Sequence, residues 1–79
     1  MNYETLIVTF AKPIRTLDAF FDNSEVWGAA TLKEWIDSYE STCFTIIDDC
    51  RAVITSEYNM TSVREWLEKY MPLAEVKVL

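Results

Sequence analysis

The side chains in this sequence with the most capacity for chemistry are carboxylates, and most of them fall between residues 16 and 50. This segment holds eight acidic side chains against Lys33 alone, a net charge of −7, whereas the whole chain of 79 residues carries −6. The eight are Asp18, Asp22, Glu25, Glu34, Asp37, Glu40, Asp48 and Asp49. Paired carboxylates can exchange protons or bind a divalent cation. Adjacent acids such as Asp48 and Asp49 are too common in turns to define a metal site, so we predict neither a metal nor a cofactor.

Other requirements of catalysis are missing from the sequence. It contains no histidine, which is the commonest general base, and no serine or threonine lies in a motif that supplies a base. The single glycine excludes the glycine-rich loops that bind dinucleotides and nucleotide phosphates. We therefore expect a protein that is not an enzyme.

The two cysteines, Cys43 and Cys50, do not have the spacing of a metal motif, and there is no histidine to complete a zinc site. The sequence begins without the basic leader and apolar run of a signal peptide. It also lacks an apolar run of the roughly 20 residues that a membrane-spanning helix needs. We therefore expect a cytoplasmic protein in which both cysteines are thiols.

Two segments of the chain, Thr31–Tyr39 and Ser62–Tyr70, share one pattern: hydroxyl, aliphatic, cation, Glu, Trp, aliphatic, acid, variable, Tyr. In each segment apolar side chains recur at i, i+3, i+4 and i+7, the spacing of one helix face. The stripes are Leu32, Trp35, Ile36 and Tyr39 in the first segment, and Val63, Trp66, Leu67 and Tyr70 in the second. Each segment opens with a hydroxyl side chain that is followed three residues later by Glu, the signature of a capping box. The repeat predicts two amphipathic helices with both tryptophans in the core.

Runs of β-branched and alternating apolar residues surround both predicted helices. The runs are Thr5–Ala11, Thr42–Ile47, Arg51–Glu57 and Ala74–Leu79, with Asp48 and Asp49 in a turn between the second and third. The order is strand, helix, strand, strand, helix, strand, which is the ferredoxin-like split βαβ arrangement. We predict one α+β domain over residues 1–79, with an antiparallel sheet and two helices on one of its faces. The repeated sequence pattern is then explained by two βαβ halves, each of which supplies one helix that covers the same sheet.

The connection Lys12–Ala30, between the first strand and the first helix, is long for a compact domain. Its apolar side chains suit one or two helical turns docked on the core, and Gly28 suits an unusual backbone angle. Two interpretations stay open at this point. The insertion is either packing or the working surface of the protein, with Trp27 as a candidate anchor.

The acidic side chains belong to the insertion, the first helix and the following hairpin, which lie next to one another in the predicted fold. Such a negative field attracts basic surfaces and repels phosphate, so we expect no direct nucleic-acid binding and no membrane binding. One interpretation is a solvated face that keeps a small protein soluble. The other is a binding face for a basic protein surface, such as the nucleic-acid groove of a larger complex. Its candidate residues are Asp18, Asp22, Glu25, Trp27, Glu34, Asp37, Glu40, Asp48 and Asp49.

Two functional hypotheses follow. In size, acidity and lack of catalytic groups the chain is similar to phage-encoded inhibitors of host defence, such as anti-CRISPR proteins, although this likeness is compositional and rests on no motif. The first hypothesis is therefore an inhibitor that occludes a basic, nucleic-acid-binding surface. The alternative is a regulatory or structural subunit that forms a homodimer through the open face of its sheet, where Ile7 and Val53 lie among polar residues. The protein is then either a monomer or a homodimer.

Overall fold

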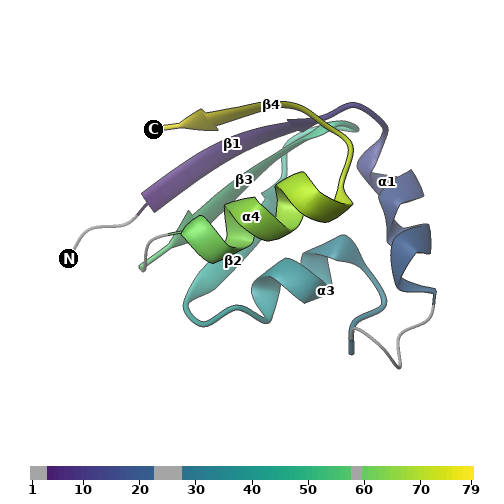
Figure 1. The fold of residues 1–79 in the computed structure, drawn as a ribbon, viewed down its shortest axis with the longest axis horizontal. Helices are drawn as coiled ribbons and strands as arrows, with labels where there is room; N and C mark the ends of the chain where they lie inside the picture. The colour runs from purple at the N-terminus through teal and green to yellow at the C-terminus, as the bar shows by residue number, and fades with distance from the viewer. Residues whose placement is uncertain (1–3, 23–27, 58–59) are drawn as a thin grey trace.

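The computed structural model describes residues 4–22, 28–57 and 60–79 and has an α+β fold, shown in Figure 1. In chain order the elements are β1 (Glu4–Phe10), α1 (Ile14–Leu17), the 3-10 helix η1 (Asp18–Phe21), α3 (Leu32–Asp37), β2 (Thr42–Ile46), β3 (Arg51–Ser56), α4 (Thr61–Tyr70) and β4 (Leu73–Val78). The predicted strands and helices are therefore present, with ends that shift by up to two residues. The insertion after β1 forms α1 and η1, in agreement with the one or two helical turns expected there.

The four strands form one antiparallel sheet with the order β2-β3-β1-β4. The central pair places Ile7 opposite Val53, and Ile7 also lies opposite Lys77 of β4. On the other side of β3, Phe44 of β2 lies opposite Ile54. The strands β2 and β4 are therefore the two edges of the sheet, and each has one neighbouring strand in the described part of the chain.

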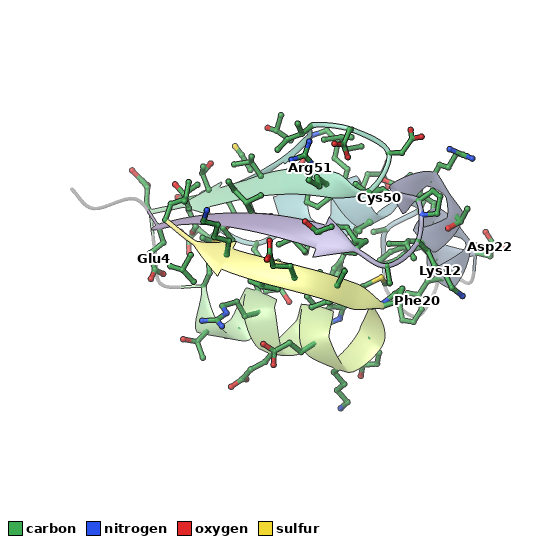
Figure 2. The ribbon with its side chains drawn as sticks, turned by 90° about the horizontal axis from the view of Figure 1, so that it is seen from above. Glu4, Lys12, Phe20, Asp22, Cys50 and Arg51 are labelled. Carbon is green, nitrogen blue, oxygen red and sulfur yellow. The ribbon has the colours of Figure 1, made fainter. Side chains whose placement is uncertain are left out.

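One face of the sheet is buried beneath the helices. Side chains alternate between the two faces along a strand, so every second residue lies on the same face. The buried residues of this face are Leu6, Val8 and Phe10 of β1 and Ala52 and Ile54 of β3. In Figure 1 the helices α3 and α4 lie in front of the sheet, on this buried face. The other face is open, and Figure 2 shows Arg51 on the side of the sheet away from α4.

The two copies of the sequence repeat meet in space. Trp35 of α3 and Trp66 of α4 occupy equivalent positions in the repeat, and their rings lie 5.5 Å apart between centroids. Phe21 of η1 stacks on the same Trp66 ring at 6.0 Å with an interplanar angle of 19°. The aromatic rings therefore join η1, α3 and α4 in one layer over the sheet. Trp66 is buried and Trp35 is half-buried, which agrees with the prediction of two core tryptophans.

The start of α4 differs from the prediction. Ser62 was expected to cap this helix in a box with Glu65, but the helix begins at Thr61, its N-cap residue is Met60, and the Met60 side chain makes no capping hydrogen bond. Instead the Met60 N–H donates to Glu4 Oε2 of β1 at 2.6 Å. In a capping box, a Glu three residues into the helix accepts the N–H of the N-cap residue. Here Glu4 of β1 accepts that N–H instead.

Gly28 has φ +73°, so the expected unusual backbone angle is confirmed. A Cβ added at this position would meet no atom within 4 Å. The requirement for glycine is therefore conformational rather than steric.

We predict that Gly28→Ala lowers the free energy of unfolding by about 1 kcal/mol, because alanine resists the left-handed region. Gly28→Asn should cost less, because asparagine tolerates that region. Urea unfolding followed by tryptophan fluorescence measures both variants. Equal stability of the alanine variant and the parent protein would show that the backbone angle carries no cost.

Candidate functional site

Two hydrogen bonds and one packing contact bring the acidic elements together. The Ile14 N–H donates to the Asp49 carbonyl at 2.6 Å, which joins α1 to the β2–β3 turn. The Leu32 N–H donates to Asp18 Oδ1 at 3.0 Å, which joins η1 to the start of α3. In addition, α3 packs on β2. The insertion, the first helix of the repeat and the hairpin therefore adjoin, as the sequence predicts.

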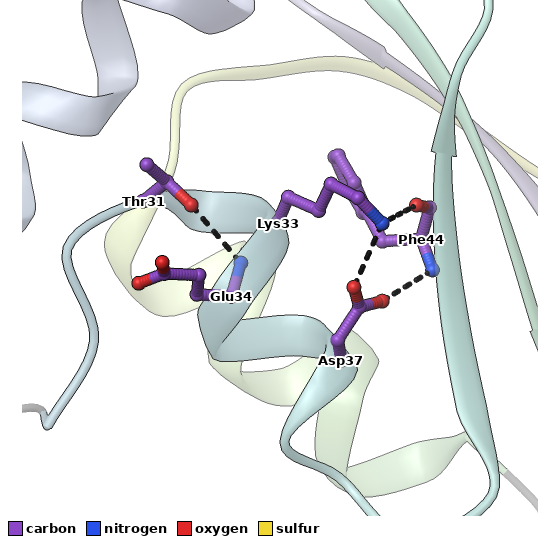
Figure 3. Close-up of polar contacts among 5 residues, drawn as sticks. All are labelled: Thr31, Lys33, Glu34, Asp37 and Phe44. Carbon is purple, nitrogen blue, oxygen red and sulfur yellow. Dashed lines mark hydrogen bonds and ion pairs between the residues drawn. The ribbon is translucent and has the colours of Figure 1, made fainter.

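The N-terminus of α3 is held by side-chain oxygens. Thr31 Oγ1 accepts from the Glu34 N–H at 3.1 Å, so the cap predicted at Thr31 is confirmed (Figure 3). The Glu34 carboxylate reaches back to the Ala30 N–H at 2.8 Å, one residue before the cap. With Asp18 on Leu32, two of the N–H groups that a helix start leaves without an intrahelical partner have acceptors, those of Leu32 and Glu34.

A second polar arrangement protects the edge strand β2. Lys33 Nζ lies 2.8 Å from Asp37 Oδ2 and donates to the Phe44 carbonyl at 3.0 Å. Asp37 Oδ1 accepts from the Phe44 N–H at 2.8 Å (Figure 3). Both backbone groups of Phe44 that point away from β3 are thus bonded by one i,i+4 pair of α3. This pair supplies the two bonds that a further strand would supply at this residue.

Asp48 organises the turn between β2 and β3. Its Oδ1 accepts from the N–H groups of Cys50 at 3.0 Å and Arg51 at 2.8 Å, while its Oδ2 lies 2.7 Å from Arg51 Nε. The Arg51 side chain, followed by the Cys50 N–H, holds the pKa of Asp48 below its ordinary value of 3.8. The neighbouring Asp49 forms a longer, exposed contact of 3.8 Å with Arg15.

A hollow of about 450 Å³ lies between α1, the start of α3 and the β2–β3 turn, and we call it the hairpin pocket. Its lining residues are Ile14, Arg15, Asp18, Thr31, Lys33, Ile46, Asp48 and Asp49. The isoleucines provide apolar surface, and three carboxylates and two cations surround it. A long side chain with an aliphatic stem and a cationic head has the matching chemistry, since its stem packs on apolar surface while its head meets a carboxylate.

The predicted site residues fall into four groups. Asp18, Asp48 and Asp49 line the hairpin pocket, and Glu34 and Asp37 lie on α3. Asp22 follows η1 and Glu40 follows α3, and both are exposed, with no side-chain hydrogen bond or ion pair to the described residues. Glu25 and Trp27 lie outside the described residues. The structure therefore brings three of the nine around one hollow.

Five residues that line the pocket were not predicted as site residues: Ile14, Arg15, Thr31, Lys33 and Ile46. The sequence did offer a signal for Ile46, because Ile46 and Ile47 directly precede the two aspartates of the predicted turn. Apolar side chains beside a turn can remain exposed and line a pocket. Ile46 is 50% exposed and Ile47 48% exposed. Arg15 offered no signal, since only the folded chain places it near Asp49.

Within residues 4–22, 28–57 and 60–79, no three His, Cys, Asp or Glu side chains are grouped as ligands of a metal ion would be. In the same ranges no helix has the length and apolar character needed to cross a membrane. Cys43 is an exposed thiol on β2, and Cys50 is a half-buried thiol before β3.

We predict that Asp37→Ala destabilises the fold by about 1–2 kcal/mol, because it leaves the Phe44 N–H without its acceptor. Asp37→Asn should cost less, since its amide oxygen still accepts that bond. Glu68→Ala, on the exposed surface of α4, is the matched control and should change stability by less than about 0.5 kcal/mol. Chemical denaturation compares the three. An Asp37→Ala variant as stable as the Glu68→Ala control would contradict the role of the edge contact.

Asp48 gives a prediction about pH. Because its pKa is lower in the folded chain than in the unfolded chain, its ionised form stabilises the fold above about pH 4, and this contribution disappears as the pH falls through the lowered pKa. Asp48→Asn should therefore flatten the loss of stability below about pH 4, and Arg51→Ala should flatten the same part of the profile. Urea titrations at graded pH measure the slopes. Parallel slopes for the parent and Asp48→Asn would refute the assignment.

The fold and the site can be compared with known proteins. No curated protein and no solved structure matches the chain. A family described as Domain of unknown function (DUF6956) matches residues 1–78. Since the match spans nearly the whole chain, the protein belongs to the DUF6956 family.

Proposed function

We propose that this protein binds a basic surface of a larger protein through its acidic end, without catalysing a reaction. The acidic end comprises α1, η1, α3 and the β2–β3 turn. The observation that carries the proposal is the hairpin pocket, where apolar side chains and carboxylates from separate elements surround one hollow. A lysine or arginine of the partner would place its stem against Ile14 and Ile46 and its charged head near Asp18 or Asp49.

The predicted acidic residues divide into two kinds. Asp37, Asp48 and Asp49 have cationic neighbours within the protein, which reduces their attraction for a partner. Asp22 and Glu40 have no such neighbour in the described part of the chain, so their charge acts outward. Asp22 follows η1 at the acidic end, whereas Glu40 precedes β2, at the end of that strand opposite the β2–β3 turn. Charges of this kind raise association rates and suppress wrong partners, while a buried anchor supplies most of the affinity.

In its finer form, the proposal is an inhibitor that occludes the nucleic-acid-binding groove of its partner. The negative field supports this form, because a groove that binds phosphate is itself positively charged. The open sheet face has Thr5, Ile7 and Thr9 on β1 and Val53 and Thr55 on β3. These central positions lack the aromatic pair with which related sheets stack RNA bases, which supports a protein partner over RNA.

We also propose that the fold is the ferredoxin-like split βαβ. The strand order β2-β3-β1-β4 with antiparallel neighbours supports it, as do α3 and α4 on one face. In this arrangement each βαβ half contributes one helix, and the shared Trp position of the repeat brings those helices together.

The proposal predicts that a nine-residue oligoarginine peptide, used as a stand-in for a basic surface, binds the acidic end in a salt-dependent manner. Asp22→Lys with Asp49→Lys should weaken binding by about tenfold at low salt, because two exposed attractive charges of the acidic end become repulsive. Fluorescence anisotropy of the labelled peptide measures the affinity.

Glu65→Lys with Glu68→Lys on α4 is the matched control, since it changes the net charge by the same amount at another place. This control should weaken binding by less than about threefold. Equal losses for the two double variants would mean that net charge alone attracts the peptide. Binding that ignores salt would overturn the electrostatic mechanism.

A further inference from the structure

The outer edge of β4 carries backbone groups that have no strand partner in the described part of the chain. The Leu79 N–H donates to the Thr5 carbonyl at 3.0 Å, and Lys77 lies opposite Ile7. Because bonded and non-bonded pairs alternate in an antiparallel ladder, the N–H and C=O of Val76 and Val78 point away from β1. Val78 is also 54% exposed. An edge of this kind is a template for a further strand.

The side chains of this edge alternate in a self-complementary way. Glu75 and Lys77 lie opposite Thr9 and Ile7, so both project from the open face of the sheet. Val76 lies opposite Val8 and projects from the other face. Neither Glu75 nor Lys77 has an ion pair among the described residues. The segment Glu75–Val76–Lys77 therefore has opposite charges placed symmetrically about a valine.

We infer that two copies of this chain associate edge to edge through β4, antiparallel about Val76. In that register Val76 lies opposite its own copy, and Glu75 of each chain lies opposite Lys77 of the other. Two ion pairs form on the open face, and the outward backbone groups of Val76 are satisfied across the two-fold axis. The four-stranded sheet becomes continuous across both copies.

The charges also select this register over its neighbours. A two-fold axis at Glu75 would place Glu75 opposite itself, and an axis at Lys77 would place Lys77 opposite itself. Like charges directly opposite each other destabilise a strand pair. A register displaced by a single residue would place Glu75 and Lys77 opposite valines. It would also turn the side chains of one copy to the opposite face of the shared sheet. The partner that best complements this edge is therefore a second copy of the chain.

The inference does not rest on the proposed function, because β4 and β2 are opposite edges of the sheet. The hairpin pocket is lined by Ile46 of β2 and stays open in the dimer. Such a dimer would present two acidic ends, and a partner with two basic sites would bind it more tightly than it binds one copy.

Charge reversal tests the inference by sedimentation equilibrium over a range of concentrations. Lys77→Glu and Glu75→Lys change the net charge in opposite directions, yet each should weaken the dimer by about tenfold or more, because each replaces both ion pairs with like-charge pairs. The double variant Glu75→Lys with Lys77→Glu restores opposite pairs and should dimerise like the parent.

A mixture of the two single variants gives the sharpest outcome. Its heterodimer pairs opposite charges at both positions, so mixing should restore dimerisation that neither variant shows alone. Val53→Glu on the open face should leave the dimer intact, because β1 separates Val53 from β4. The inference is overturned by a parent protein that stays monomeric, by a mixture that fails to associate, or by a dimer that Val53→Glu abolishes and the reversals spare.

Discussion

The contact between Trp35 and Trp66 is the packing interaction on which the remaining structure depends. The helix α3 has only six residues, too few to be stable alone, so its position comes from tertiary packing. Trp66 also receives Phe21 of η1, and Phe20 lies 6.0 Å from the same ring. This cluster fixes the insertion beside α3. Asp18 is thereby placed where its carboxylate reaches the Leu32 N–H and lines the hairpin pocket.

The acidic end consequently serves two purposes with the same residue type. Asp18, Asp37 and Asp48 accept backbone N–H groups and hold α3, β2 and the turn in place. Acidic side chains that hold the fold in this way also contribute to the negative field outside the molecule. Asp22 at this end, and Glu40 beyond the other end of β2, contribute to the field without such a structural role in the described part of the chain. Variants of these two residues can therefore change the field with little effect on folding.

Much of the fold could be predicted from the sequence because the relevant signals are local. Leu32 and Ile36 of the first stripe are buried, as are Val63 and Leu67 of the second, and the alternation in β1 separates Leu6 from Ile7 correctly. The cap at Thr31 needs only the three residues after it. The cap expected at Ser62 was wrong because Glu4, far away in the sequence, bonds Met60 instead.

The site was harder to predict because its contacts depend on the tertiary structure. The i,i+4 spacing of Lys33 and Asp37 indicates an ion pair on a helix, but not that both side chains bond to the backbone of an edge strand. That inference needs the strand order, which sets β2 at the edge. Likewise, the carboxylates around the hairpin pocket come from η1 and the β2–β3 turn, whose proximity follows from the Ile14–Asp49 bond.

The central claim is that the protein recognises positive charge at one end only. A titration of the isotope-labelled protein with the oligoarginine peptide, followed by amide NMR shifts, tests it most directly. The account predicts shifts concentrated in α1, η1, α3 and the β2–β3 turn, with α4 and β4 nearly unchanged. Shifts spread evenly over the molecule, or centred on α4, would contradict it.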